Sequence, residues 1–292
     1  MRQTLIASLL LSLLSLLPDC RAQAQQPPQA PGPVTLSKIA DRVYEVLEGR
    51  GARGGVYVGN DAVLLIDTKM DKESVDQTLA AVKQVTDRQV RYVVNTHSDF
   101  DHVRGNQYLP EGVVFISHQN CRREFLLPGR DGKPSEWNDP ALARFIPGIT
   151  YSDRLDLHLG AAPIELWYFG AGHTRGDTVV YIREAKIAFL GDQFFAGRPQ
   201  LIHVPKGGNS FEHVKTLRKM LDTLDATTFC SGHTAPVDRA AIMKHIAEME
   251  ERQAKVKALI EQGKTPEEAK AAFPGNEAAL VQTIWNELTE KR

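Results

Sequence analysis

Two imidazoles and two carboxylates lie within the short segment His97–His102, whose sequence is HSDFDH. The segment follows an apolar run, Val90–Val94, that predicts a buried strand. Such side chains at a strand end are costly to remove from water unless something pairs with them. A divalent metal is a natural partner for this mixture of nitrogen and oxygen ligands. From these residues alone, the alternative is a polar turn in which Asp101 caps a helix.

Three later segments repeat the pattern of a possible ligand shortly after a strand-like apolar run. The possible ligands are His173, Asp192 and His233, and the runs are 164–169, 187–190 and 227–230. Ligands from the ends of several strands meet at one edge of a sheet, where loops form a site on a rigid base. Taken singly, each His or Asp is explained better by a structural role than as a ligand. Four such segments in this order indicate a metal site.

The ordered set of motifs resembles the metallo-β-lactamase superfamily, whose pattern is H-x-H-x-D-H followed by a His, an Asp and a last His. The resemblance extends over nearly all of the chain after its first residues. It implies a four-layer αββα sandwich of the α/β class and two metal ions, expected to be zinc. The implied ligands are His97, Asp99 and His173 for the first metal, Asp101, His102 and His233 for the second, and Asp192 as the bridge between them.

One position departs from that pattern, because Asp99 stands where the second His is expected. Some branches of the superfamily carry a carboxylate there, among them phosphodiester-cleaving enzymes and di-iron flavoproteins. A carboxylate is a harder ligand than an imidazole, so iron or manganese is possible at the first site. Every other ligand position matches the pattern.

The expected chemistry is metal-assisted hydrolysis of an ester, thioester, amide or β-lactam. Metal coordination brings the pKa of water toward about 7, and a hydroxide that bridges the two metals attacks the carbonyl. Asp101 would both ligate the second metal and orient this nucleophile. The sequence contains no G-x-S-x-G motif that would supply a serine nucleophile. A phosphodiesterase, an iron-dependent redox enzyme and a non-catalytic metal-binding protein stay open as alternatives.

Several further residues are candidates for binding a small-molecule substrate or for orienting ligands. The candidates for substrate binding are His118, His203, Lys206 and Asn209. Lys206 would hold a substrate carboxylate as a point charge. Thr174 and Asp177 are predicted to orient the ligands, since a metal-bound histidine usually donates its other N–H to a nearby acceptor.

The start of the chain predicts export to a bacterial periplasm or beyond. Residues 1–24 have a positive first part, an apolar core and a small-residue cleavage pattern, which is typical of a signal peptide, and 25–36 form a flexible lead-in. A lipoprotein anchor at Cys20 is the alternative. Cys121 and Cys230 would then remain, and whether they pair is open. For Cys230, the favoured interpretation is a small buried hydrophobic residue.

Alternating strand and helix patterns predict a metallo-β-lactamase-like domain over 37–236 and a C-terminal helical extension over 237–292. The extension is expected to cover the edge of the sandwich, although pairing with another subunit is the alternative. The net charge of −1 and pI of about 6.8 lack the basic footprint of nucleic-acid binders, so no nucleic-acid partner is expected. The chain after residue 24 contains no apolar run long enough for a membrane span. The oligomeric state is left open.

Overall fold

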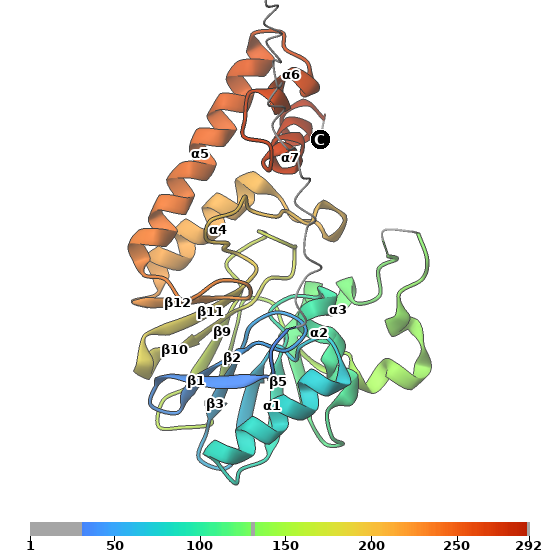
Figure 1. Ribbon diagram of the computed structural model, residues 1–292, viewed down its shortest axis with the longest axis vertical. Coiled ribbons are helices and arrows are strands. Elements are labelled where there is room, and N and C mark those ends of the chain that lie inside the picture. Colours follow the sequence, from blue (N-terminus) through green and yellow to red (C-terminus); the bar gives the residue numbers. More distant parts are fainter. Residues whose placement is uncertain (1–30, 130–131, 291–292) are drawn as a thin grey trace, which may run out of the picture. The chain divides into compact units, whose positions relative to one another are not determined.

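Two β-sheets pack face to face in the computed structural model, which describes residues 31–129 and 132–290 (Figure 1). The predicted signal segment 1–24, which includes Cys20, and the first half of the lead-in 25–36 lie outside the described residues.

The first sheet has seven strands in sequence order. They are β1 (Thr35–Ala40), β2 (Val43–Leu47), β3 (Gly54–Val58), β4 (Val63–Ile66), β5 (Val90–Val94), β6 (Val114–His118) and β7 (Ile149–Tyr151). The first four strands pair antiparallel, and β4 to β7 pair parallel. Parallel neighbours need crossover connections, which α1 supplies between β4 and β5.

The second sheet has five strands in the order β12-β11-β10-β9-β8. They are β8 (Arg154–Leu157), β9 (Ile164–Trp167), β10 (Val179–Ile182), β11 (Ile187–Gly191) and β12 (Thr228–Ser231). Only β11 and β12 are parallel, and the helix α4 connects them.

The helices are α1 (Lys72–Val85), α2 (Phe100–Val103), α3 (Gln119–Glu124), α4 (Ser210–Thr223), α5 (Arg239–Glu261), α6 (Pro266–Ala271) and α7 (Ala278–Thr289). Short 3₁₀ turns lie at Arg104–Tyr108, Glu136–Asn138, Pro140–Phe145, Arg183–Ala185 and Val204–Lys206. Capping fixes several helix starts. Asp71 accepts from Ser74 N at α1, and Thr265 forms a capping box with Glu268 at α6. None of the helices in the described part of the chain is long and apolar enough to span a bilayer.

Three buried hydrophobic clusters separate four layers. One lies between the sheets and includes Tyr57, Ile116 and Leu166. A second lies between the first sheet and the helices on its outer face, and a third lies between the second sheet and α4 with the C-terminal helices. The structure is therefore the αββα sandwich that the sequence predicts.

The C-terminal helices cover α4, as Figure 1 shows. Ile246 and Met249 of α5 and Ile284 of α7 belong to the same buried cluster as Leu217 of α4. At the other end of the domain, β1 begins at Thr35, inside the predicted lead-in, and was not among the predicted strands. It is an edge strand with partly exposed residues on both faces, so its sequence lacks a clear alternating pattern.

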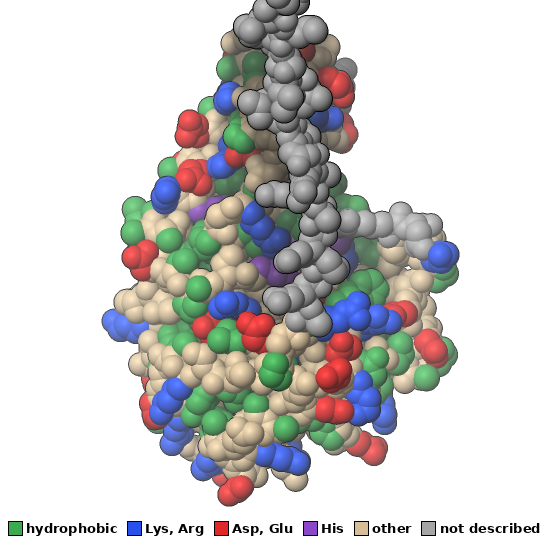
Figure 2. Space-filling view, viewed as in Figure 1, with side chains coloured by type: hydrophobic (Ala, Val, Ile, Leu, Met, Phe, Trp, Pro, Cys, Tyr) green, Lys and Arg blue, Asp and Glu red, His purple; other side chains and the backbone are tan. Residues whose placement is uncertain are grey.

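Charged side chains of both signs are interspersed over the described residues of the face in Figure 2, where they form no broad patch of one sign. Cys121 and Cys230 are buried and unpaired. Cys230 lies in the cluster between the sheets, which fits a small hydrophobic residue.

Candidate metal centre

All seven predicted ligands lie in segments that follow strands of the two sheets. His97 and Asp99 follow β5, Asp101 and His102 lie in α2, and His173 is in the loop after β9. Asp192 directly follows β11, and His233 follows β12. Strands from both sheets thus deliver side chains to one place, which the structure shows as two neighbouring groups sharing Asp192.

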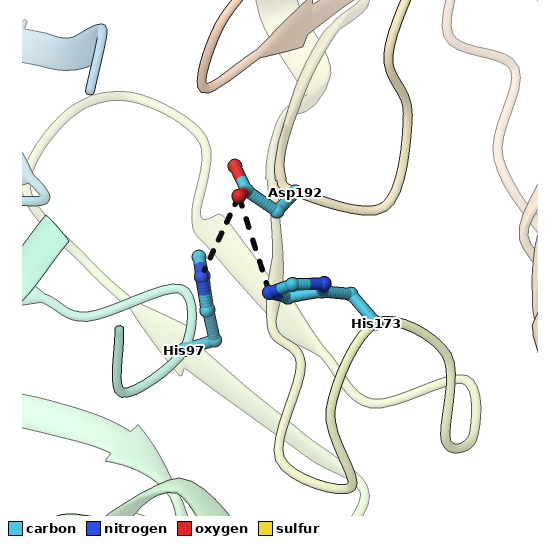
Figure 3. A group of neighbouring side chains, drawn as sticks. All are labelled: His97, His173 and Asp192. Atoms are coloured by element: carbon cyan, nitrogen blue, oxygen red, sulfur yellow. Dashed lines mark ion pairs between the residues drawn. The ribbon is translucent and has the colours of Figure 1, made fainter. Parts of the chain in front are cut away.

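The first group contains His97, His173 and Asp192, whose side chains point toward one another in Figure 3. The Oδ2 atom of Asp192 lies 3.9 Å from the Nε2 atoms of both histidines. Asp99 completes this group: its Oδ2 atom is 3.0 Å from His173 Nε2 and 3.7 Å from His97 Nε2. The spacing leaves one imidazole or carboxylate atom of each residue facing a common centre.

The second group contains Asp101, His102 and His233. His233 Nε2 lies 3.2 Å from Asp101 Oδ2 and 3.2 Å from Asp192 Oδ2. His102 Nε2 lies 3.0 Å from Asp192 Oδ1, yet neither atom has a partner in hydrogen-bonding geometry. Asp192 Oδ1 therefore faces His102, and its Oδ2 faces both His233 and the histidines of the first group, so this carboxylate lies between the two groups.

The unpartnered atoms show that these residues fit a metal. The Nε2 atoms of His97 and His102 and Oδ1 of Asp192 are buried and accept or donate no hydrogen bond. Buried polar atoms without partners are rare because each costs about 1–3 kcal/mol. A divalent ion held by these nitrogen and oxygen atoms would satisfy all three at once.

The Nδ1 atoms of three of these histidines form hydrogen bonds within the protein. His97 Nδ1 donates to Thr96 Oγ1 at 3.1 Å, and His173 Nδ1 donates to the Leu201 carbonyl at 2.9 Å. His102 Nδ1 donates to Asp67 Oδ2 at 2.7 Å. Each bond fixes the tautomer that leaves Nε2 free to ligate, which is the usual arrangement around a metal-bound histidine.

Asp99 has two further partners, both from the loop that follows Asp192. Its Oδ1 atom accepts from His203 Nδ1 at 2.9 Å and from Lys206 Nζ at 2.7 Å. Lys206 also donates to the carbonyl of Ser98 at 2.8 Å. Asp99, His173 and His203 form another group with ligand atoms close together, so His203 lies at the edge of the first metal position.

Burial and charge act in opposite directions on these groups. Burial would raise the pKa of Asp192, but the neighbouring imidazoles of His102 and His233 hold that pKa well below its usual value. For Asp99, hydrogen bonds from His173 and His203 likewise outweigh burial and lower the pKa. Burial would lower the pKa of His173, but Asp99 and Asp192 raise it to about 9. Metal uptake must therefore displace a proton from this site.

Glycine at position 232 allows His102 and Asp192 to approach the backbone. A Cβ atom there would lie 2.6 Å from Asp192 Oδ1 and 2.6 Å from His102 Cε1. The segment after β12 can therefore deliver His233 to the site only if position 232 has no side chain.

The structure gives three of the other candidates structural roles. His118 is 1% exposed, its Nε2 donates to the Ser152 carbonyl, and its Nδ1 accepts from Asn120 N at the start of α3. Its ring also stacks on Tyr168, so it has no free edge for a substrate. The Asn209 side chain caps α4 by accepting from two backbone N–H groups. Lys206 is paired with Asp99 and is not free to hold a substrate carboxylate as the sequence suggested.

Thr174 and Asp177 bond to each other and not to a ligand imidazole. The Asp177 carboxylate accepts from the backbone N–H of Thr174 and, at 2.6 Å, from its hydroxyl. The pair stiffens the loop that carries His173. The prediction that they accept a ligand N–H directly is wrong for His173, whose Nδ1 bonds to Leu201.

Asp67 was missed by the sequence reasoning, although it holds the imidazole of His102, a candidate ligand. It directly follows the buried strand β4 and accepts from Thr96 N, Thr96 Oγ1 and His102 Nδ1. A carboxylate at the end of an apolar run is the signal that identified Asp192, so the same signal at LLID could have found it.

Comparison with known proteins gives a family match over most of this region. The model of the metallo-beta-lactamase superfamily matches residues 53–233, which include all seven predicted ligands. The chain belongs to this superfamily.

Two curated relatives match at low identity. The chain is 23% identical over 188 residues to the metallo-beta-lactamase type 2 of Bacteroides fragilis, covering 61% of this chain and 70% of that protein. It is 25% identical over 168 residues to the 2,4-dinitroanisole O-demethylase subunit alpha of Nocardioides sp. (strain JS1661). That match covers 56% of this chain and 47% of the demethylase subunit.

Solved structures share the fold. A metallo-beta-lactamase from Pontibacter korlensis aligns with a TM-score of 0.62 at 17% identity, covering 74% of this chain and 99% of that one. The metallo-beta-lactamase FIM-1 from Pseudomonas aeruginosa, in its mono-zinc form, aligns with a TM-score of 0.61 at 18% identity, covering 76% and 97%. Family membership and the histidine and aspartate groups together support a metal-dependent hydrolase.

Proposed function

We propose that this protein is a binuclear zinc hydrolase that cleaves an ester, thioester, amide or β-lactam. The observation that carries the proposal is the bridging position of Asp192, with one oxygen 3.0 Å from His102 and the other 3.9 Å from both His97 and His173. A single metal would use only one of these two groups.

The residues that would hold the metals form two sets that share Asp192. The first set is His97, Asp99 and His173, the second set is Asp101, His102 and His233, and Asp192 belongs to both. Bound zinc would supply Lewis acidity and bring the pKa of water toward about 7.

Among the ligands, Asp101 is the one placed to handle the nucleophile. Its side chain is 33% exposed and lines a cavity, whereas the Asp192 side chain is 5% exposed. An open carboxylate beside His233 can orient a water molecule and accept its proton, which is the role of a general base. Asp67 holds the imidazole of His102 in one orientation, and Thr96 does the same for His97.

Elemental analysis of protein purified without added metal or chelator tests the proposal, together with His102→Ala and His233→Ala. We expect about two zinc ions per chain, and a loss of at least about 100-fold in kcat/KM in either variant because each removes a ligand of the second metal. Retained turnover in both variants would refute the mechanism. Iron in place of zinc would favour the redox alternative, and one zinc would mean that a single site works.

We also propose export, on the sequence of residues 1–24 alone. Sequencing the N-terminus of the protein recovered from the periplasm or medium tests this. A mature chain that begins near residue 25 is expected, and an intact Met1 in a cytoplasmic fraction would contradict it.

A further inference from the structure

A cavity of about 700 Å³ opens beside the metal centre. Asp99 and Asp101, from the two ligand sets, both line it. Its other walls come from the end of α3, the segments 127–129 and 133–137, and the loop with His203 and Lys206. Small-molecule sites are clefts of roughly 300–1,000 Å³, so this cavity has the size and position of a substrate pocket.

Its walls are largely apolar. Phe100, Leu127, Trp137 and Pro205 line it. Phe100 is 47% exposed and Leu127 is 41% exposed, which leaves apolar surface in contact with water beside the site. Burying such surface is favourable at roughly 25 cal/mol per Å², so an apolar group of a ligand would bind here.

Exposed apolar residues are concentrated around this part of the molecule. Nine large hydrophobic side chains are exposed in the described chain, and five of them lie in the segments 100, 126–127 and 201–204 that supply the cavity walls or flank the ligand loops. Clustered exposure of this kind marks a binding surface.

The walls around the acyl group favour an uncharged one. Lys206 already donates to Asp99 and to the Ser98 carbonyl. A carboxylate on the acyl group would be removed from water between Phe100, Leu127 and Trp137, which is unfavourable unless it is paired.

We propose that the substrate is an uncharged acyl ester or amide whose apolar acyl group fills this cavity against Phe100, Leu127 and Trp137. The proposal rests on the proposed hydrolase function. The carbonyl lies at the end of the cavity formed by Asp99 and Asp101. Water oxygen bonds to the carbonyl carbon, the bond to the leaving group breaks, and one water proton passes by way of Asp101 to the leaving group.

A series of p-nitrophenyl esters tests the substrate class on the zinc-loaded protein. We expect kcat/KM to rise at least about tenfold from acetate to octanoate, since each buried methylene contributes up to about 0.8 kcal/mol. The butyrate ester should exceed the anionic hemisuccinate by at least about fivefold, because the carboxylate of the hemisuccinate would leave water against apolar walls. Equal rates along the chain-length series, or preference for the hemisuccinate, would overturn the proposal.

Variants locate the effect in this cavity. Leu127→Ser and Phe100→Ser should lower the ratio of kcat/KM for the octanoate to kcat/KM for the acetate by about tenfold, because the longer chain loses the apolar contact. Leu288→Ser, on an exposed hydrophobic residue of α7, is the matched control and should change neither. Equal losses on both esters, with zinc content unchanged, would show that these residues do not contact the acyl chain.

Binding of ketones, which cannot be hydrolysed, separates this proposal from the hydrolase function. Calorimetry should show 2-decanone binding to the zinc-loaded protein, weaker binding of 2-butanone, and a loss of at least about fivefold in 2-decanone affinity in Leu127→Ser. If 2-decanone binds in this way while no ester is cleaved, the pocket stands and the hydrolase function fails. If esters are cleaved without chain-length dependence and 2-decanone does not bind, the pocket proposal fails alone.

Discussion

Asp99 has the surroundings of a working ligand. Its Oδ2 atom faces His97 and His173, its Oδ1 atom accepts from Lys206, and His203 Nδ1 lies 2.9 Å from Oδ1 and 3.2 Å from Oδ2. A carboxylate brings a negative charge that an imidazole would not, and Lys206 lies where that charge can be balanced. The substitution at this position is thus matched by a loop residue 107 positions later.

Replacing Lys206 with Met should destabilise the metal-free protein more than the zinc-loaded protein. Without metal, the partly buried Asp99 loses its closest cation, which should cost about 1–3 kcal/mol. With zinc bound, the metal balances the same carboxylate and the cost should fall below about 1 kcal/mol. Urea unfolding of both forms measures the difference.

Two further variants serve as controls for the Lys206→Met measurement. Lys206→Arg should keep most of the stability, and Lys83→Met, which removes an exposed lysine of α1, should have no effect in either form. An equal cost for Lys206→Met with and without zinc would mean that Lys206 does not compensate the charge of Asp99.

Glu124 should make stability depend on pH. Burial is the main cause that raises its pKa from 4.5 to about 8, and its Oε2 atom accepts from Ser98 Oγ at 3.0 Å. Between these two values the folded state binds more protons than the unfolded state, so the contribution of Glu124 is full below pH 4.5 and is lost as the pH rises to about 8. Glu124→Gln should remove this loss. The free energy of unfolding of the variant minus that of wild type should therefore be larger at pH 9 than at pH 5, by on the order of a few kcal/mol. Thermal unfolding of both proteins across this range measures it, and parallel pH profiles would contradict the assignment.

At the level of elements, two loops hold the first ligand set together. Two backbone N–H groups of the loop after β11 donate to the loop after β9. His203 N donates to the His173 carbonyl at 2.7 Å, and Asn209 N donates to the Gly172 carbonyl at 3.1 Å. In return, Arg175 N donates to the Lys206 carbonyl at 2.9 Å. His173 is therefore positioned by the segment that also supplies Lys206.

Gly208→Ala should separate these loops. A Cβ atom at position 208 would lie 2.1 Å from the His173 carbonyl oxygen and 3.0 Å from His203 N, both backbone atoms that cannot move aside cheaply. We expect a loss of about 2–4 kcal/mol of stability, as for overpacking in a rigid site, and weaker metal retention against a chelator. Gly275→Ala, where a Cβ would meet nothing within 4 Å, is the matched control. Wild-type metal retention in Gly208→Ala would show that the loop contact does not position His173.

The elements themselves differ in how well the sequence predicts them. The sequence is sufficient to predict helix α1, because Asp71 provides an N-cap and the apolar spacing is regular. The same holds for the start of α6 at the Thr265 capping box and for the start of α5 after Asp238. β1 was not predicted, since it is paired only with β2 and has a register shift between Lys38 and Ala40. The local pattern of apolar and polar residues does not predict a strand that forms only because it pairs with a neighbouring strand.

The prediction of the site residues from sequence is limited in the same way, because their contacts depend on distant parts of the chain. The sequence could propose the ligands from their order along the chain. In contrast, His203 and Lys206, which bond to Asp99, lie more than 100 positions away, and their contact depends on how two loops meet. For this reason Lys206 was predicted to face a substrate and is found bound to Asp99. The role of Asp67 depends equally on β4 lying beside β5 in the sheet.

For the molecule as a whole, the three buried clusters and the candidate metal centre lie in different places and involve different residues. The clusters consist of hydrophobic residues between four layers and contain none of the seven ligands. The ligands lie beyond the strand ends, where His102 and His173 are fully buried. Burying imidazoles and carboxylates together is unfavourable unless the group is neutralised, so metal binding should add stability without being required for the fold.

Chelation of the purified protein should therefore lower its melting temperature without unfolding it. Metal at about 100 times its dissociation constant contributes about 2.7 kcal/mol, or roughly 5–10 °C for a domain of this size. The far-ultraviolet circular dichroism spectrum should stay the same, since the sheets and helices are held by the hydrophobic clusters. Added zinc should restore the lost stability.

The size of this shift should also depend on pH. Because the pKa of His173 is raised to about 9 in the metal-free site, metal binding at neutral pH releases a proton, and the shift should shrink as the pH falls from 8 to 6. His102→Ala is the control, and its melting temperature should respond much less to chelator because the second ligand set is incomplete. A wild-type protein that loses its circular dichroism spectrum on chelation would show that the metal holds the sandwich itself together, and an unchanged melting temperature would show that these ligands bind no metal in the folded protein.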